Sequence, residues 1–210
     1  VRWARFFIPT HGAYQDRDKK SGPSDRPRIT GADMTIMIPT WVEGKLTPVE
    51  KLEAHQRGLK HKAVSVFVLN GENVLLQKRA SSKYHTPGLW ANTCCTHPDW
   101  DEDPATCAVR RLKEELGITG LYPAYRDTVE YRADVGGNLI EHEVVDVFVA
   151  HADTSLKLDL NPDEVEETAW VSLYDLNAEI SRRPNRFTPW LKIYLQDFHE
   201  RIFGALISAE

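Results

Sequence analysis

The sequence predicts an α/β fold, because a strand-like hairpin, a stretch with helical spacing of apolar residues and a further strand-like stretch follow one another. Residues 63–69 (AVSVFVL) and 74–79 (VLLQKR) are strand-like runs, and Asn70-Gly71-Glu72-Asn73 between them is typical of a hairpin turn. Residues 103–117 repeat apolar side chains at helical spacing. Residues 139–150 (LIEHEVVDVFVA) are strand-like again. With 210 residues and ordinary apolar and charged fractions, the chain is long enough for one sizeable core.

The predicted domain spans residues 34–210, and residues 1–33 are predicted to form a flexible extension. This first segment has a short aromatic start and then a stretch rich in Pro, Ser, Gly, Asp, Lys and Arg, without helical or strand period. Because Met34 and Met37 are the only methionines, we expect a natural start at Met34. An arm that docks on a partner is the alternative for residues 1–33.

Short elements are predicted before the hairpin. Residues 35–38 (TIMI) indicate a strand. Thr47 as N-cap, Pro48 at the first helical position and Glu50 three residues after the cap predict that a helix starts there. Gly58 is expected to interrupt this helix.

The strongest helix signals lie at residues 103–117. Asp103 can cap the helix, Pro104 suits its first position and Gly117 can end it. At about 100° per residue, Arg111 and Glu115 lie one turn apart at the edge of the apolar stripe. Helix geometry therefore predicts that these two side chains face a site together.

A strand pair is predicted after this helix. Residues 128–133 and 139–150 flank a turn at Gly136-Gly137-Asn138. Because side chains alternate along a strand, Glu141 and Glu143 should share one face.

The C-terminal part predicts one more strand and two helices. The strand is expected over residues 164–171 and the first helix over 173–180. Thr188 as cap and Pro189 at the first position predict a final helix whose apolar side continues to Ile202.

Charge and hydropathy narrow the class of protein. The formal net charge of −5 argues against a nucleic acid or an anionic membrane as partner, although local basic clusters can bind a small anion. No apolar run approaches the ~20 residues that span a bilayer, and the N-terminus has no secretory pattern. We therefore expect a soluble, cytoplasmic protein, and a monomer or weak dimer.

The three cysteines are a poor disulfide framework, since two of them, Cys94 and Cys95, are adjacent. They suit a reducing compartment in which a free thiol can be used. Cys95 is followed two residues later by His97. A reactive thiol, a histidine and a carboxylate-bearing helix thus fall within residues 88–118.

Residues 110–118 (RRLKEELGI) resemble the tail of the Nudix box, R-E-U-x-E-E-x-G-U with U aliphatic. Glu102 stands at the acidic position upstream of Arg110. Arg111 departs from the pattern by replacing a Glu, and an insertion at about residues 91–98 displaces the upstream Gly. A damaged box with an inserted Cys-Cys-Thr-His-Pro resembles the type 1 isopentenyl-diphosphate isomerases, over about residues 34–202.

The resemblance implies a Nudix-like α/β/α sandwich with a mixed β-sheet. It also implies an isomerase of isoprenoid biosynthesis that interconverts isopentenyl and dimethylallyl diphosphate through a tertiary carbocation. Because a proton arrives at one carbon and leaves a neighbouring one, two titratable groups must flank the substrate. The resemblance assigns them to Cys95 and Glu143, and leaves open which one adds the proton.

Two aromatic residues have roles in the same resemblance. Tyr131 matches a tyrosine whose phenol hydrogen-bonds the carboxylate and relays its proton. Trp190 matches a C-terminal tryptophan whose π face stabilises the carbocation. From the sequence alone, Trp190 is equally interpreted as a core aromatic at the start of a helix.

Three histidines and two glutamates could bind a metal ion. They supply nitrogen and oxygen ligands for a roughly octahedral divalent ion such as Mn or Mg, with Zn also possible. The resemblance matches each of them to a metal ligand, namely His55, His61, His97, Glu141 and Glu143. Spacing alone is weak evidence, because loop histidines are more often exposed or hydrogen-bonded.

A basic loop at residues 78–83 could bind the diphosphate. Arginine can hold phosphate oxygens at two points and lysine acts as a point charge. The resemblance assigns the diphosphate contacts to Arg79, Lys83 and Arg111, and assigns Glu115 to a second Mg ion bound with the diphosphate. Without the resemblance, the loop would be interpreted as a solvent-exposed face, and Glu115 as a surface ion-pair partner of Arg111.

Two other functions are compatible with parts of the pattern. A Nudix pyrophosphohydrolase of a nucleoside or prenyl diphosphate needs several box carboxylates to gather metal, and Arg111 removes one of them. A non-catalytic protein could hold a structural zinc on Cys95, His97 and the early histidines. In that case Glu141 and Glu143 would have no purpose.

Overall fold

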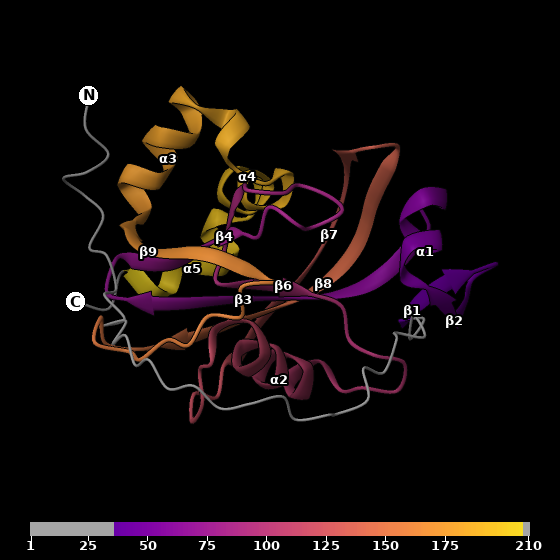
Figure 1. Ribbon diagram of the computed structural model, residues 1–210, viewed down its shortest axis with the longest axis horizontal. Coiled ribbons are helices and arrows are strands. Elements are labelled where there is room, and N and C mark those ends of the chain that lie inside the picture. The colour runs from indigo at the N-terminus through magenta and orange to yellow at the C-terminus, as the bar shows by residue number, and fades with distance from the viewer. Residues whose placement is uncertain (1–35, 208–210) are drawn as a thin grey trace, which may run out of the picture.

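The computed structural model of the protein describes residues 36–207, and the side chains up to residue 204 (Figure 1). The predicted extension at residues 1–33 lies outside the described residues. The elements in chain order are β1 (Met37–Val42), β2 (Lys45–Glu50), α1 (Lys51–Arg57), β3 (Lys60–Asn70), β4 (Asn73–Arg79), β5 (Trp90–Ala91), β6 (Cys94–Thr96), α2 (Pro104–Leu116), β7 (Ala124–Gly136), β8 (Leu139–His151), β9 (Val165–Ser172), α3 (Leu173–Arg182), the 3₁₀ turn η2 (Pro184–Arg186), α4 (Pro189–Asp197) and α5 (His199–Ile207).

The sheet is mixed, and β3 is its central strand. β3 pairs parallel with β8 and antiparallel with β1, β4 and β6. β7 and β8 form the predicted antiparallel pair, while β9 pairs antiparallel with β4. The pairing of β3 with β8 brings His61 opposite Glu143, and the pairing with β6 brings Ser65 opposite Cys95. Residues from three distant segments therefore meet along the first half of β3.

Helices cover both faces of this sheet. In Figure 1, α2 lies below the strands, and α3 and α4 lie above them. One core contains Val64, Val66 and Val68 of β3 with the buried side of α2. The other contains Phe67 of β3 with side chains of α3, α4 and α5. Since successive side chains of a strand point to opposite faces, β3 supplies both cores. The predicted α/β/α sandwich with a mixed sheet is confirmed.

The predicted helix at residues 103–117 is also confirmed. Asp103 Oδ2 accepts a hydrogen bond from the Thr106 N–H at 2.9 Å, and Pro104 is the first helical residue. Gly117 ends the helix at φ 68°, a conformation that glycine adopts without strain. A Cβ on Gly117 would lie 2.6 Å from that of Asp159, so no larger residue fits.

The predicted helix start at Thr47 is wrong. Thr47 pairs with Thr40 in the β1–β2 ladder, and α1 begins at Lys51. The Glu50 carboxylate caps it by accepting from the N–H groups of Leu52 at 2.9 Å and Glu53 at 2.8 Å. Pro48 is tolerated because β2 is an edge strand, where no neighbour needs its missing N–H. Gly58 ends α1 in the left-handed conformation, as predicted.

The predicted final helix is two helices. α4 ends at Asp197 and α5 begins at His199, with Phe198 between them at φ −124°. Both helices bury apolar side chains in the same core, so the apolar period continues through the break. Thr188 precedes α4 as predicted, but its side chain makes no capping hydrogen bond. Its N–H instead donates to the Trp90 carbonyl at 2.9 Å, which ties α4 to β5.

Candidate active site

One pocket gathers most of the predicted site residues. Those that line it are Arg79, Lys83, Cys95, His97, Arg111, Glu115, Glu141, Glu143 and Trp190. The three that do not line it, His55, His61 and Tyr131, are buried directly behind it. The ring centroids of His55 and His61 lie 5.1 and 5.0 Å from that of His97, and the Tyr131 hydroxyl contacts both glutamates of β8. All of the predicted residues therefore belong to one region.

Two of the histidines are oriented as metal ligands. His55 Nδ1 lies 2.6 Å from the Lys51 carbonyl oxygen, and His61 Nδ1 lies 2.7 Å from that of Leu59. A carbonyl only accepts, so each Nδ1 carries the hydrogen and each Nε2 has a free lone pair. Both Nε2 atoms are buried and have no hydrogen-bond partner among the described residues. Such orphaned nitrogens fit a bound cation.

The remaining predicted ligands complete two overlapping groups. Ligand atoms of His55, His61, His97 and Glu143 lie within 4.8 Å of one another. Glu141 falls in a second group with His55 and His85. Imidazole and carboxylate donors in this number fit a divalent metal ion. His85 was not predicted, because one histidine in a loop forms no recognisable motif.

His55 and His97 are uncharged at neutral pH, as metal ligands must be. Burial, and then the neighbouring His61, lower the pKa of His55 to about 4. Burial also lowers the pKa of His97 well below its usual value, against the hydrogen bond to Glu143. Each ring can therefore offer a lone pair.

Glu143 connects the histidines to Tyr131. Its Oε1 lies 3.0 Å from His97 Nε2 and 3.6 Å from His61 Nε2, and its Oε2 accepts from the Tyr131 hydroxyl at 2.6 Å. Burial by itself raises the pKa of Glu143, but the nearby His61 and the hydrogen bond with His97 outweigh it and bring the pKa well below its usual value. Burial and the Glu143 charge raise the pKa of Glu141. Glu143 is thus the ionised member of the pair.

Cys95 faces the pocket, whereas its neighbour Cys94 packs against α2. Cys95 Sγ lies 3.0 Å from the Ser65 hydroxyl, which in turn lies 2.8 Å from the Tyr194 hydroxyl. Burial, and next the Glu143 charge, raise the pKa of the Cys95 thiol well above its usual value. The sulfur therefore carries a proton at neutral pH, suited to donation rather than to nucleophilic attack.

Trp190 forms a wall of the same pocket and is fully buried. The guanidinium carbon of Arg79 lies 5.3 Å from the centroid of its ring, which is cation–π distance. The Trp190 side chain thus lines the pocket and also contacts the Arg79 guanidinium.

Four cations line the pocket, namely Lys51, Arg79, Lys83 and Arg111. Arg79 is buried, and its Nε has no hydrogen-bond partner among the described residues. Burial, followed by the charges of Lys83 and Arg111, lowers the pKa of Lys51 to about 8. Lys51 was missed because its helix was predicted to start earlier. Buried positive charge of this kind favours an anionic ligand.

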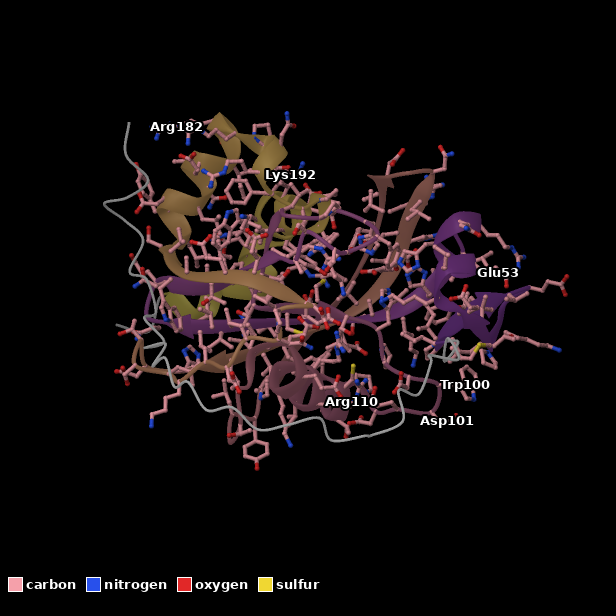
Figure 2. All side chains as sticks on the ribbon, in the orientation of Figure 1. Glu53, Trp100, Asp101, Arg110, Arg182 and Lys192 are labelled. Atoms are coloured by element: carbon pink, nitrogen blue, oxygen red, sulfur yellow. The ribbon has the colours of Figure 1, made fainter. Side chains whose placement is uncertain are left out.

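The predicted pair of Arg111 and Glu115 faces the pocket. Arg111 donates to Glu115 Oε1 at 2.7 Å, and Gln77 donates to Glu115 Oε2 at 3.0 Å. Arg110, labelled in Figure 2, lies on another side of α2 and binds Glu102 at 2.6 Å. The retained arginine of the box is therefore structural, and the arginine that replaces a box Glu is the one in the pocket.

Known proteins match this chain over most of its length. A NUDIX domain model matches residues 59–191. An isopentenyl-diphosphate delta-isomerase of Dinoroseobacter shibae is 66% identical over 176 residues, which are 84% of this chain and 100% of the relative. The chain belongs to the isopentenyl-diphosphate delta-isomerase family. Another family member, from Cereibacter sphaeroides strain KD131, is 67% identical over 173 residues, 82% of this chain and 98% of the relative.

Solved structures agree with the Nudix fold of this isomerase-family chain. A protein of Deinococcus radiodurans superposes with a TM-score of 0.60 at 14% identity, over 76% of this chain and 97% of the other. A MutT NUDIX hydrolase of Burkholderia pseudomallei has a TM-score of 0.50 at 27% identity, over 65% and 96%. In the isomerase-family chain, the segment inserted into the box contains β6, which brings Cys95 and, directly after the strand, His97 to the pocket.

None of the helices within residues 36–207 has the length and apolar character needed to cross a bilayer.

Proposed function

We propose that this chain interconverts isopentenyl diphosphate and dimethylallyl diphosphate by adding a proton at one carbon and removing one at a neighbouring carbon. The observation that supports this best is that Cys95 and Glu143 line one pocket, walled by Trp190. A hydrolase needs metal-bound water at the phosphates, and its box carboxylates would have to be free to hold that metal. Here Arg111 replaces one of these carboxylates and places a positive charge in the pocket instead.

The proton-transfer groups differ in charge, as the reaction requires. Cys95 is a neutral thiol, and its contact with Ser65 and Tyr194 orients the sulfur. Glu143 is a carboxylate with Tyr131 at 2.6 Å, close enough to pass a proton to or from it. The carbocation formed between them would be shielded from water and would face the Trp190 ring. Which group adds the proton depends on the direction of the reaction.

We propose one divalent ion, Mn, Mg or Zn, held by His55, His61, His97, Glu141 and Glu143. The orphaned nitrogens of His55 and His61 support it. When bound, this ion would hold the glutamates ionised and fix their orientation. The two histidines are already oriented by backbone carbonyls.

We propose that the diphosphate lies at the mouth of the pocket, against Arg79, Lys83 and Arg111. A second Mg ion, bound with the diphosphate, would contact Glu115. The substrate is thus a small diphosphate. The expectations of a monomer or weak dimer, of no nucleic-acid partner and of a cytoplasmic location remain predictions from the composition.

Deuterium labelling tests the reaction. With isopentenyl diphosphate and Mg in deuterated water, we expect dimethylallyl diphosphate that carries deuterium in a methyl group, because the added proton comes from a group that exchanges with solvent. The measurement is mass spectrometry and NMR of the recovered diphosphates. Release of inorganic phosphate or of the monophosphate, without the allylic isomer, would instead indicate a pyrophosphohydrolase.

Arg79→Ala should weaken substrate binding before it affects turnover. The loss of charge-assisted hydrogen bonds should raise KM about ten- to a hundredfold, with a smaller change in kcat. Steady-state kinetics measure this. Lys78→Ala is the matched control, because Lys78 is on the same strand but pairs with Glu166 at 2.7 Å, away from the pocket. Equal KM values for Arg79→Ala and the control would show that Arg79 does not contact the diphosphate.

A further inference from the structure

Glu164 lies between two of the cations assigned to the diphosphate. Its Oε2 accepts from Lys83 Nζ at 2.5 Å, and its Oε1 lies 3.3 Å from a terminal nitrogen of Arg111. The carboxylate lines the pocket with them. Neither the sequence patterns nor the proposed mechanism gives this residue a role.

The backbone holds Glu164 in this place. Its carbonyl oxygen accepts from the Ala80 N–H at 2.9 Å, and its N–H donates to the Asn161 carbonyl at 3.0 Å. Ala80 directly follows β4, so this contact joins Glu164 to the start of the basic loop. Burial tends to raise the pKa of Glu164, but the hydrogen bond and charge of Lys83 outweigh it and lower the pKa below its usual value. The side chain is thus a fixed negative charge.

The four cations of the pocket differ in how far carboxylates already neutralise them. Lys83 pairs with Glu164, and Arg111 pairs with Glu164 as well as with two glutamates of α2. In contrast, neither Lys51 nor Arg79 forms an ion pair with any carboxylate that the structure describes. A diphosphate would therefore meet two open cations and two occupied ones.

We propose that Glu164 is an internal counter-ion of the diphosphate site, which holds Lys83 and Arg111 in the empty enzyme and is displaced when the diphosphate arrives. The proposal takes the position of the diphosphate from the proposed function. A carboxylate and a diphosphate that share the same two cations repel each other, and this repulsion weakens binding. Glu164 would thus position the two cations while it limits the affinity for the ligand.

The limit on affinity acts equally on substrate and product, since both carry the same diphosphate. An interaction that is the same in ground state and transition state changes KM without lowering the chemical barrier. Weaker binding of the product also speeds its release. The reverse role, in which Glu164 joins Glu115 as a ligand of the Mg ion, predicts the opposite effect of removing the charge.

Glu164→Gln tests this, because it removes the charge and keeps the shape. In Mg-saturated enzyme, calorimetry with inorganic pyrophosphate should give a dissociation constant about tenfold lower than that of the unchanged protein. KM for isopentenyl diphosphate should fall by a similar factor, without a matching rise in kcat. The control is Glu166→Gln, two residues further on in β9 and paired with the half-buried Lys78, which should change neither value.

Affinity that is unchanged or weaker in Glu164→Gln would overturn the counter-ion role, and weaker affinity only when Mg is present would make Glu164 a ligand of that ion. Circular dichroism and a thermal melt verify that the variant is folded. The pyrophosphate measurement needs no isomerisation. If the unchanged protein fails to isomerise, the proposed function is lost, and tighter pyrophosphate binding by Glu164→Gln still supports the counter-ion.

Discussion

Cys95→Ala should lower kcat about 10²- to 10⁴-fold, the usual effect of removing a proton donor or acceptor, and leave substrate affinity nearly unchanged. The sulfur lies in the pocket next to Ser65 Oγ at 3.0 Å. None of the four cations that line the pocket hydrogen-bonds to it. In the proposed mechanism its proton contributes to the barrier, whereas the diphosphate would be held elsewhere. Single-turnover kinetics and pyrophosphate calorimetry measure the two effects separately.

Two further variants separate acidity from packing. Cys95→Ser keeps a hydroxyl that can contact Ser65, but an alcohol is a much weaker acid than a thiol, so turnover should remain low. Cys94→Ala removes the adjacent thiol, which is buried against α2. It should lower thermal stability through the cavity it creates, while kcat per folded molecule stays the same. Normal turnover in Cys95→Ala would exclude the thiol from the reaction.

The sequence predicts best those parts of the fold that neighbouring residues in the chain determine. The helix α2 begins and ends where Asp103, Pro104 and Gly117 place its boundaries, because capping and left-handed backbone depend on adjacent residues. The face shared by Glu141 and Glu143 follows in the same way from alternation along one strand. Both glutamates are buried and line the same pocket, so they do share one face.

The errors in the predicted helix boundaries arise from contacts between residues that are distant in the sequence. Thr47 and Pro48 have the residue types of a helix start, but pairing with β1 extends them as a strand, and pairing is invisible in the local sequence. The break at Phe198 is hidden because α4 and α5 pack on the same core and keep one apolar period. The spacing of apolar residues therefore predicts which side of a helix or strand is buried better than it predicts where that element ends.

The residues of the candidate site also fall into two groups, those that a local motif predicts and those that only the tertiary structure reveals. Cys95 and His97 are found because they lie in a compact motif within a recognisable box. Glu164 and Lys83 are 81 residues apart and meet only because β9 pairs with β4. Glu164 is a lone polar residue with no spacing to recognise, so its part in a site follows only from the tertiary structure.

Glu143→Gln should lower both turnover and the retention of the metal, two properties that most single substitutions affect separately. The carboxylate contacts Tyr131 at 2.6 Å and His97 at 3.0 Å, so it belongs both to the proposed proton-transfer pair and to the group that could hold a metal ion. Glutamine keeps the shape but cannot take up a proton, and it removes a negative charge from a divalent site. We expect kcat to fall about 10²- to 10⁴-fold and the tightly bound metal to be lost on dialysis.

Metal analysis by mass spectrometry, together with chelator competition, measures the second effect without reference to activity. The matched control is Glu130→Gln on β7, since Glu130 also contacts a histidine, His142 at 3.1 Å, but on the exposed face of the same strand pair. That variant should keep both metal and turnover. If Glu143→Gln keeps its metal but loses turnover, Glu143 transfers the proton without being a ligand the metal needs; if it keeps turnover, a different group must accept the proton opposite Cys95.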